Sequence, residues 1–157
     1  MKKEETFDHH IKSTWHAISR MYNQQASKYG GTMSVGYVLL NISNEEGAQA
    51  TKIAPQMGLE ARSLTRILKS MEEKALIYRV PDPSDKRGVL VFLTKKGIEM
   101  KAKARETVLR FNEVMRDNIP AEKLNVFFEV LQTVNGIIER NNIYQSVNSP
   151  LVSHTNG

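Results

Sequence analysis

The sequence contains no cysteine. This absence excludes disulfide bonds, thiolate nucleophiles, thiolate zinc sites and thiol-based redox sensing. The sequence also has no run of about 18 apolar residues, the length that a membrane-spanning helix requires. The two lysines near the N-terminus are not followed by the apolar segment of a secretory signal. We therefore expect a cytoplasmic protein with no membrane partner.

Catalytic and metal-binding motifs are also missing. There is no glycine-rich phosphate loop and no nucleophile elbow. The four histidines are His9, His10, His16 and His154, and no carboxylate or cysteine completes a metal site with them at the usual ligand spacing. No convergent set of acid, base and nucleophile is visible. We therefore expect neither an enzyme nor a bound metal or other cofactor.

The positive charge of the chain is concentrated in one stretch. The 157 residues include 22 Lys and Arg against 17 Asp and Glu, a net charge of +5. Residues 48–97 hold ten of the basic and five of the acidic side chains, so this stretch carries the whole excess and the rest balances to zero. A basic surface is often only solvated. Here, however, the charge coincides with helix and hairpin patterns that dock on DNA, which favours a polyanion partner.

The first of these patterns is an amphipathic helix over residues 61–74. Its apolar residues recur at spacings of three and four and line one face: Leu64, Ile67, Leu68, Met71 and Ala75. The opposite face carries the polar and basic residues Arg62, Ser63, Thr65, Arg66, Lys69 and Ser70. A short helix over 50–57 and a turn at Gly58 precede it, which predicts a helix-turn-helix. We expect Pro55 to bend or shorten the first of these two helices.

The second pattern is a β-hairpin. Two apolar segments, 76–80 and 89–94, flank a polar turn over 81–88 that contains two prolines and the basic pair Lys86 and Arg87. A basic helix followed by a hairpin with a basic tip is typical of a winged helix-turn-helix. The fold class is therefore predicted to be mainly α with a small β-wing.

Long amphipathic helices flank the winged unit. We predict helices over 6–28 and 33–43 before it, with Thr32 as an N-cap, and over 95–118 and 121–141 after it. The expected organisation is an N-terminal helix within 1–31, a DNA-binding domain at 32–97, C-terminal helices within 98–141 and a flexible tail at 142–157. Helices from both chain ends suggest a dimerisation bundle. The alternative is that they only close a monomeric core.

A recognisable pattern of residues runs through the end of the helix over 61–74, the hairpin and the start of the next helix. It consists of Leu68, Met71 to Glu73, Leu76, Ile77, Arg79, Asp82, Pro83, Asp85, Arg87, Leu93, Thr94 and Gly97. These residues resemble the signature of the MarR family of transcriptional regulators, which reads roughly Leu-Glu-x-x-Gly-Leu-Ile-x-Arg, then Asp-x-Arg, then Leu-Thr-x-x-Gly. The chain departs from the family pattern at Ala75, where glycine is usual, and at Glu60, where Ser or Thr commonly caps the recognition helix.

The polar face of the helix over 61–74 supplies the candidate DNA contacts. We expect Arg62, Ser63 and Arg66 to reach base edges, because arginine can bridge guanine O6 and N7. Thr65 and Lys69 are expected to contact phosphate. For each residue the alternative is a solvated side chain without a partner.

The hairpin tip supplies the remaining contacts. Arg87 is expected to probe the minor groove, where a narrow groove concentrates negative potential, and Lys86 to contact phosphate. The resemblance further implies that Asp85 braces the wing through an ion pair with Arg87 or Arg79.

The resemblance also implies a ligand. MarR-like proteins commonly bind small, often aromatic or anionic, effectors between the dimer helices and the winged lobe, and binding changes the spacing of the recognition helices. Here the candidate lining residues are Trp15, Tyr22, Met33 and Tyr37, with His16 or Arg20 as polar partners. The alternative for these residues is ordinary core packing.

Together these patterns predict a sequence-specific regulator that binds double-stranded DNA. It would act as a homodimer on a pseudo-palindromic operator, because two copies place their recognition helices about 34–36 Å apart on successive major grooves. By resemblance its usual mode is repression, with release by a small effector. The alternative is an architectural or adaptor winged-helix protein without strong sequence preference.

Overall fold

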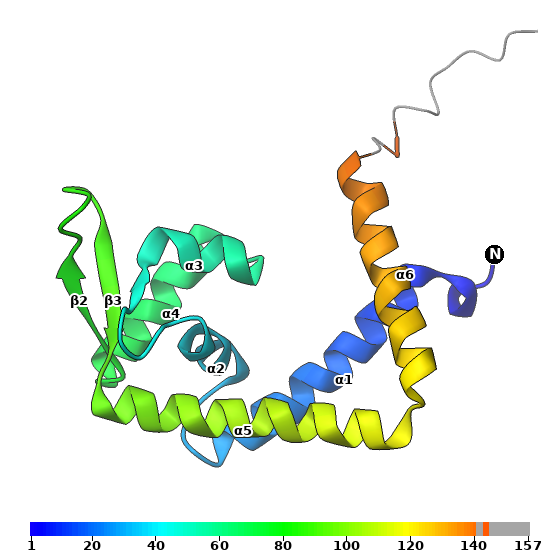
Figure 1. The fold of residues 1–157 in the computed structure, drawn as a ribbon, viewed down its shortest axis with the longest axis horizontal. Coiled ribbons are helices and arrows are strands. Elements are labelled where there is room, and N and C mark those ends of the chain that lie inside the picture. Colours follow the sequence, from blue (N-terminus) through cyan, green and yellow to red (C-terminus); the bar gives the residue numbers. More distant parts are fainter. Residues whose placement is uncertain (141–142, 145–157) are drawn as a thin grey trace, which may run out of the picture. The chain divides into compact units, whose positions relative to one another are not determined.

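The computed structural model describes residues 1–140 and 143–144. Within them the fold is mainly α with a small sheet, as predicted, and its elements follow one another along the colour gradient of Figure 1. The elements are η1 (Lys3–Glu5), α1 (Phe7–Ser27), α2 (Met33–Leu40), β1 (Ala48–Gln49), α3 (Ala50–Met57), α4 (Ala61–Glu73), β2 (Ile77–Pro81), β3 (Val89–Leu93), α5 (Lys95–Asn118) and α6 (Ala121–Arg140). The predicted tail falls outside the described residues, apart from Ile143 and Tyr144.

The chain divides into two compact units, with the boundary inside α5 between Arg110 and Phe111. The first unit holds α1 to α4, the sheet and most of α5. The second holds the end of α5 and α6. None of the described helices has the length and apolar character needed to cross a bilayer.

The sheet is antiparallel, with strand order β1-β3-β2. β2 and β3 form the predicted hairpin, in which Ile77 pairs with Leu93 and Arg79 with Val91. The two-residue strand β1 pairs with β3 at Ala48 and Gln49 and was not predicted. Because α3 begins at Ala50, directly after β1, this pairing connects the wing to the start of α3. Gly47 permits this approach because it has a φ of +68°, and a Cβ there would collide with the carbonyl oxygen of Val91.

The core of the first unit lies between α2, α3, α4 and the sheet. Of the apolar face predicted for α4, Leu64, Leu68 and Met71 are buried there, whereas Ile67 is partly buried and Ala75 is exposed. The hairpin contributes Ile77, Val91 and Leu93, and Leu76 just before β2 is buried with them. The buried helical residues are Val35, Val38, Leu39, Ile53, Ala54, Leu64, Leu68 and Met71, with Ile42 following α2. Each large aliphatic side chain removed from water is worth about 1.5–3 kcal/mol. This burial orients the polar side of α4 outward.

The ends of α2 and α3 can be compared with the sequence prediction. α2 was expected to reach residue 43 but ends at Leu40, because the Asn41 side chain donates from Nδ2 to the Tyr37 carbonyl oxygen at 2.8 Å. Its predicted N-cap is confirmed, since Thr32 Oγ1 accepts from the Val35 N–H at 3.2 Å. α3 contains Pro55 and is short, with eight residues, ending at Gly58 in left-handed geometry.

Candidate nucleic-acid interface

The helix-turn-helix consists of α3, the turn at Gly58 and α4. Leu64, Leu68 and Met71 bury one side of α4. On its other side Arg62, Thr65, Arg66 and Lys69 are exposed, and Ser63 is half-buried. The Thr65 hydroxyl donates to the Ala61 carbonyl oxygen at 2.9 Å and keeps its oxygen free to accept a further hydrogen bond. Of the five α4 side chains predicted to contact DNA, four are thus exposed on one side of the helix and Ser63 is partly accessible beside them.

The wing stands beside this pair of helices, as Figure 1 shows. Its tip, residues 82–88, is closed by backbone hydrogen bonds, in which the Asp82 N–H donates to Gly88 O at 3.0 Å and the Gly88 N–H to Asp85 O at 3.0 Å. Lys86 and Arg87 lie exposed on this tip. The tip therefore presents two cations in the same unit as the exposed face of α4.

The bracing of the wing differs from the expectation. Among the described residues, Asp85 forms no ion pair with Arg79 or Arg87, and its Oδ1 instead accepts from the backbone N–H of Arg87 at 3.0 Å. Arg79 pairs with Glu72 of α4, with 3.0 Å between Nε and Oε2. The reason is position: Arg79 lies within β2, next to α4, whereas Asp85 lies out on the tip. Arg79 thus anchors the hairpin to the recognition helix, and Asp85 shapes the tip locally.

Sequence reasoning gave no role to Asp82. Its side chain is only 6% exposed. Its Oδ1 accepts from the Ser84 N–H at 2.9 Å and the Ser84 hydroxyl at 2.7 Å, and its Oδ2 accepts from Gln49 Nε2 at 3.1 Å. The Ser84 hydrogen bonds are the main cause that lowers the pKa of Asp82 from its ordinary value. The bonds between Asp82 and Ser84 could have been predicted from the sequence, because an aspartate in a turn commonly accepts from the backbone N–H two residues later. The bond to Gln49 could not, because the two residues are far apart in the sequence.

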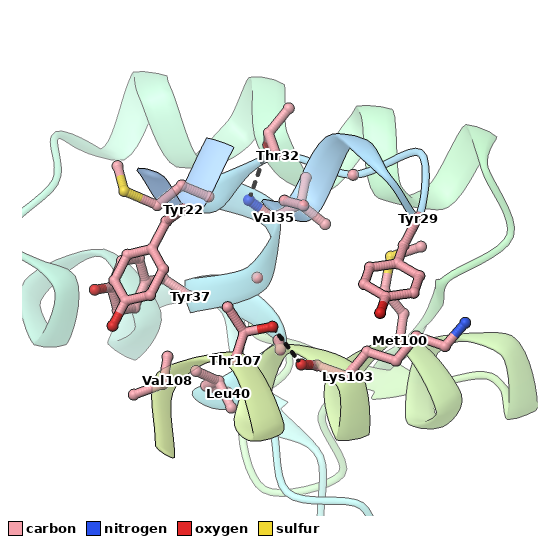
Figure 2. Close-up of a pocket in the computed structure, with 15 residues that line it drawn as sticks. Tyr22, Tyr29, Thr32, Val35, Tyr37, Leu40, Met100, Lys103, Thr107 and Val108 are labelled. Carbon is pink, nitrogen blue, oxygen red and sulfur yellow. Dashed lines mark hydrogen bonds between the residues drawn. The ribbon is translucent and has the colours of Figure 1, made fainter. Parts of the chain in front are cut away.

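A pocket opens within the first unit, between α1, α2 and α5 (Figure 2). Three of the predicted ligand residues, Tyr22, Met33 and Tyr37, line it. Trp15 and His16, and the suggested partner Arg20, do not; they are exposed on more N-terminal turns of α1. The α5 side chains of the wall were not predicted. The spacing of four residues between Met100, Ala104 and Val108 could have predicted that these side chains share one face of the helix.

The wall of the pocket is mainly apolar. Its polar groups are three tyrosine phenols, two threonine hydroxyls and the ammonium group of Lys103. Lys103 is the one charged residue among those lining it, and its Nζ lies 4.5 Å from the ring centroid of Tyr29. Tyr22 and Tyr37 meet edge to face, with centroids 6.1 Å apart. Burial, and then the neighbouring Tyr37, raises the pKa of Tyr22 to about 12, and burial also raises the pKa of Tyr37. Both phenols therefore stay neutral at physiological pH.

An exposed basic helix of a helix-turn-helix and a basic hairpin tip define a winged-helix transcription regulator. Residues 32–89 match the MarR family. The chain is 33% identical over 118 residues to the uncharacterized HTH-type transcriptional regulator YxaD of Bacillus subtilis. The aligned region covers 73% of this chain and 82% of that relative. The chain belongs to the MarR family of transcriptional regulators. Its relatives are regulators rather than enzymes.

Solved structures share the fold. The structure of the S. aureus MepR–DNA complex matches with a TM-score of 0.79 and 18% identity, over 85% of this chain and 98% of that one. PcaV from Streptomyces coelicolor, in complex with its natural ligand, matches with a TM-score of 0.75 and 21% identity, over 87% of this chain and 96% of that one. At these identities the likeness shows the winged-helix architecture.

Proposed function

We propose that this regulator binds a pseudo-palindromic operator as a homodimer and represses transcription by occupying it. The observation that carries the proposal is the exposed set of Arg62, Arg66 and Lys69 on α4, in one unit with the basic tip of the wing. In this arrangement the arginines of α4 read guanine edges in the major groove. Arg87 enters the adjacent minor groove, and Lys86 contacts phosphate. MepR, which has the same fold, was solved bound to DNA.

Exposed apolar side chains support the homodimer. On α6 Phe127 is 53% exposed and Ile138 is 60% exposed, and on α1 Phe7 is 67% exposed. Further exposed apolar residues on these helices are Ile11, Trp15, Val126, Phe128, Val130 and Ile137. Exposed apolar surface on this scale favours a protein interface, and a second copy of the chain supplies matching surface.

Selection of bound sequences from a random DNA pool tests the central claim. We expect enrichment of an inverted repeat whose half-sites are about 10–10.5 base pairs apart, the spacing of successive major grooves. The variant Arg62→Ala/Arg66→Ala should lose this enrichment while its melting temperature stays the same, because both side chains are exposed. Binding without sequence preference would instead assign the chain to the architectural or adaptor class.

The dimer has its own test. Sedimentation of the wild-type protein should give a homodimer, and Phe127→Glu/Ile138→Glu should shift it towards monomer, because a charge in an apolar interface is costly. Gln132→Glu adds one charge at an exposed polar position of the same helix and serves as the control. A monomeric wild-type protein at micromolar concentration would contradict this part of the proposal.

The pocket supports a second element, release from DNA by a small effector. Its apolar wall and the single ammonium group of Lys103 suit a planar aromatic molecule with one carboxylate. PcaV, with the same fold, was solved with a natural ligand. A panel of phenols and aromatic carboxylates should raise the melting temperature and release DNA. Lys103→Met should weaken the response to carboxylates, whereas Arg105→Met, at an exposed position of the same helix, should not. A panel without effect on either readout would contradict this element.

A further inference from the structure

One side-chain hydrogen bond links the wing tip to the helix-turn-helix. Gln49 Nε2 donates to Asp82 Oδ2 at 3.1 Å, across 33 positions of sequence. Gln49 is the last residue of β1 and the N-cap residue of α3. Asp82 directly follows β2, where the paired strands end and the tip begins. The bond thus joins the base of the tip to the start of the first helix of the DNA-binding pair.

The same carboxylate organises the tip itself. Its second oxygen accepts both the N–H and the hydroxyl of Ser84. The Asp82 backbone donates to Gly88 and accepts from the Asp85 N–H at 3.3 Å. A Cβ on Gly88 would lie 3.2 Å from Asp82 Cβ, so the two ends of the tip are closely packed. A buried carboxylate is tolerated because these donors satisfy it, and hydrogen bonds to a charged acceptor are stronger than neutral ones.

The position of this link matters for the basic tip. The ladder between β2 and β3 ends at the pair Pro81–Val89. Lys86 and Arg87 lie beyond it, on a turn whose backbone bonds run only among Asp82, Asp85 and Gly88. The bond from Gln49 ties the base of that turn to α3, which packs with α4 in the core. It is thus a side-chain contact that connects the base of the tip to the helix-turn-helix.

We propose that Gln49 and Asp82 are positioning residues that hold the basic wing tip in register with the recognition helix, so that Arg87 and the face of α4 reach one duplex together. This inference rests on the proposed DNA-binding function. Neither side chain needs to contact DNA for it. A tip that is already ordered does not have to be fixed at the moment of binding, which removes part of the cost of association.

A double-mutant cycle tests the proposal. Operator affinity is measured for the wild type, Gln49→Leu, Arg87→Ala and the double variant. Gln49→Leu should weaken binding on the order of tenfold, and Arg87→Ala should cost much less in the Gln49→Leu background than in the wild type. Additive effects would overturn the proposal. A wild-type protein that binds no DNA would instead refute the proposed function itself, so the two failures are distinguishable.

The salt dependence separates positioning from a merely structural role. Gln49 is uncharged, so its loss removes no phosphate contact of its own. If it positions Arg87, Gln49→Leu should nevertheless lower the slope of log affinity against log salt by about one, as loss of a cationic contact does. Gln24→Leu on α1, at an exposed position, is the matched control and should leave the slope unchanged. An unchanged slope in Gln49→Leu would also overturn the proposal.

An exchange of donor and acceptor guards against misfolding of a single variant. Gln49→Glu opposes two carboxylates and Asp82→Asn removes the charged acceptor, so each change alone should weaken binding. Combined, they restore a hydrogen bond between an amide donor at position 82 and a carboxylate at position 49. The pair should recover affinity and salt slope relative to Gln49→Glu alone. No recovery in a pair that melts like the wild type would count against the proposal.

Discussion

Thr94 donates its hydroxyl proton to the carbonyl oxygen of Ala75 at 2.6 Å, and the same hydroxyl oxygen accepts the N–H of Gly97 at 3.0 Å. One side chain thus caps the first turn of α5 and secures the turn between α4 and β2. A Cβ on Gly97 would collide with the carbonyl oxygen of Leu76, so glycine is required there. These contacts give a physical reason for the Leu-Thr-x-x-Gly pattern at the end of the wing.

Ala75 itself adopts a left-handed conformation, with φ of +56°. This geometry costs an L-residue about 1–2 kcal/mol, whereas glycine adopts it freely. Glycine also gives the unfolded chain more conformational entropy than alanine does, which lowers the free energy of unfolding by about 0.4–1 kcal/mol and offsets part of this gain. We therefore predict that Ala75→Gly stabilises the protein by about 0.5–1 kcal/mol in denaturant unfolding. Gly58→Ala is the converse control, because Gly58 has φ of +64° and a Cβ there would meet no other atom within 4 Å. It should destabilise by a similar amount, and shifts of equal sign would contradict the explanation.

Arg66→Ala tests base reading by the recognition helix. The side chain is exposed on α4. Its removal should cost about 1–3 kcal/mol of operator binding and relax the preference at one base pair, because a bidentate contact to guanine is lost. Affinity for a set of operators with single substitutions measures both effects. A loss of equal size on every sequence would make Arg66 a phosphate contact instead.

Arg87→Ala tests the wing. Its removal should weaken binding to many sequences and lower the salt slope by about one, because a cation that displaces counterions is lost. Lys12→Ala removes an equal charge from an exposed position on α1 and is the control. Equal affinity and slope in Arg87→Ala and the wild type would show that the wing tip does not contact DNA.

Local patterns predicted most of the elements, and long-range contacts account for what was missed. The apolar spacing of Leu64, Leu68 and Met71 was sufficient to orient α4, because burial of that stripe alone decides which side faces solvent. The contribution of Lys103 to the pocket depends on how α5 packs against α1 and α2, which no local pattern encodes. The partner of Arg79 likewise depends on the approach of β2 to α4, so the ion pair with Asp85 that the family resemblance implied is replaced by one with Glu72.

Alkaline titration tests the buried phenol of the pocket. Burial raises the pKa of Tyr22 to about 12, from an ordinary value of 10.0. The unfolded chain therefore releases this proton at lower pH than the folded protein does. The stability that the neutral phenol contributes is fully present below pH 10.0 and is lost as the pH rises through about 12.

We predict that the free energy of unfolding of the wild type falls more steeply between these pH values than that of Tyr22→Phe, which has no proton to lose at this position. Urea unfolding at closely spaced pH values measures the difference, and the tyrosinate absorbance band should show one phenol fewer titrating late in the variant. Tyr144→Phe removes a phenol that is 84% exposed and serves as the matched control. Parallel pH profiles for Tyr22→Phe and the wild type would mean that the pocket hydrates the Tyr22 hydroxyl, and an apolar ligand would then have to displace that water.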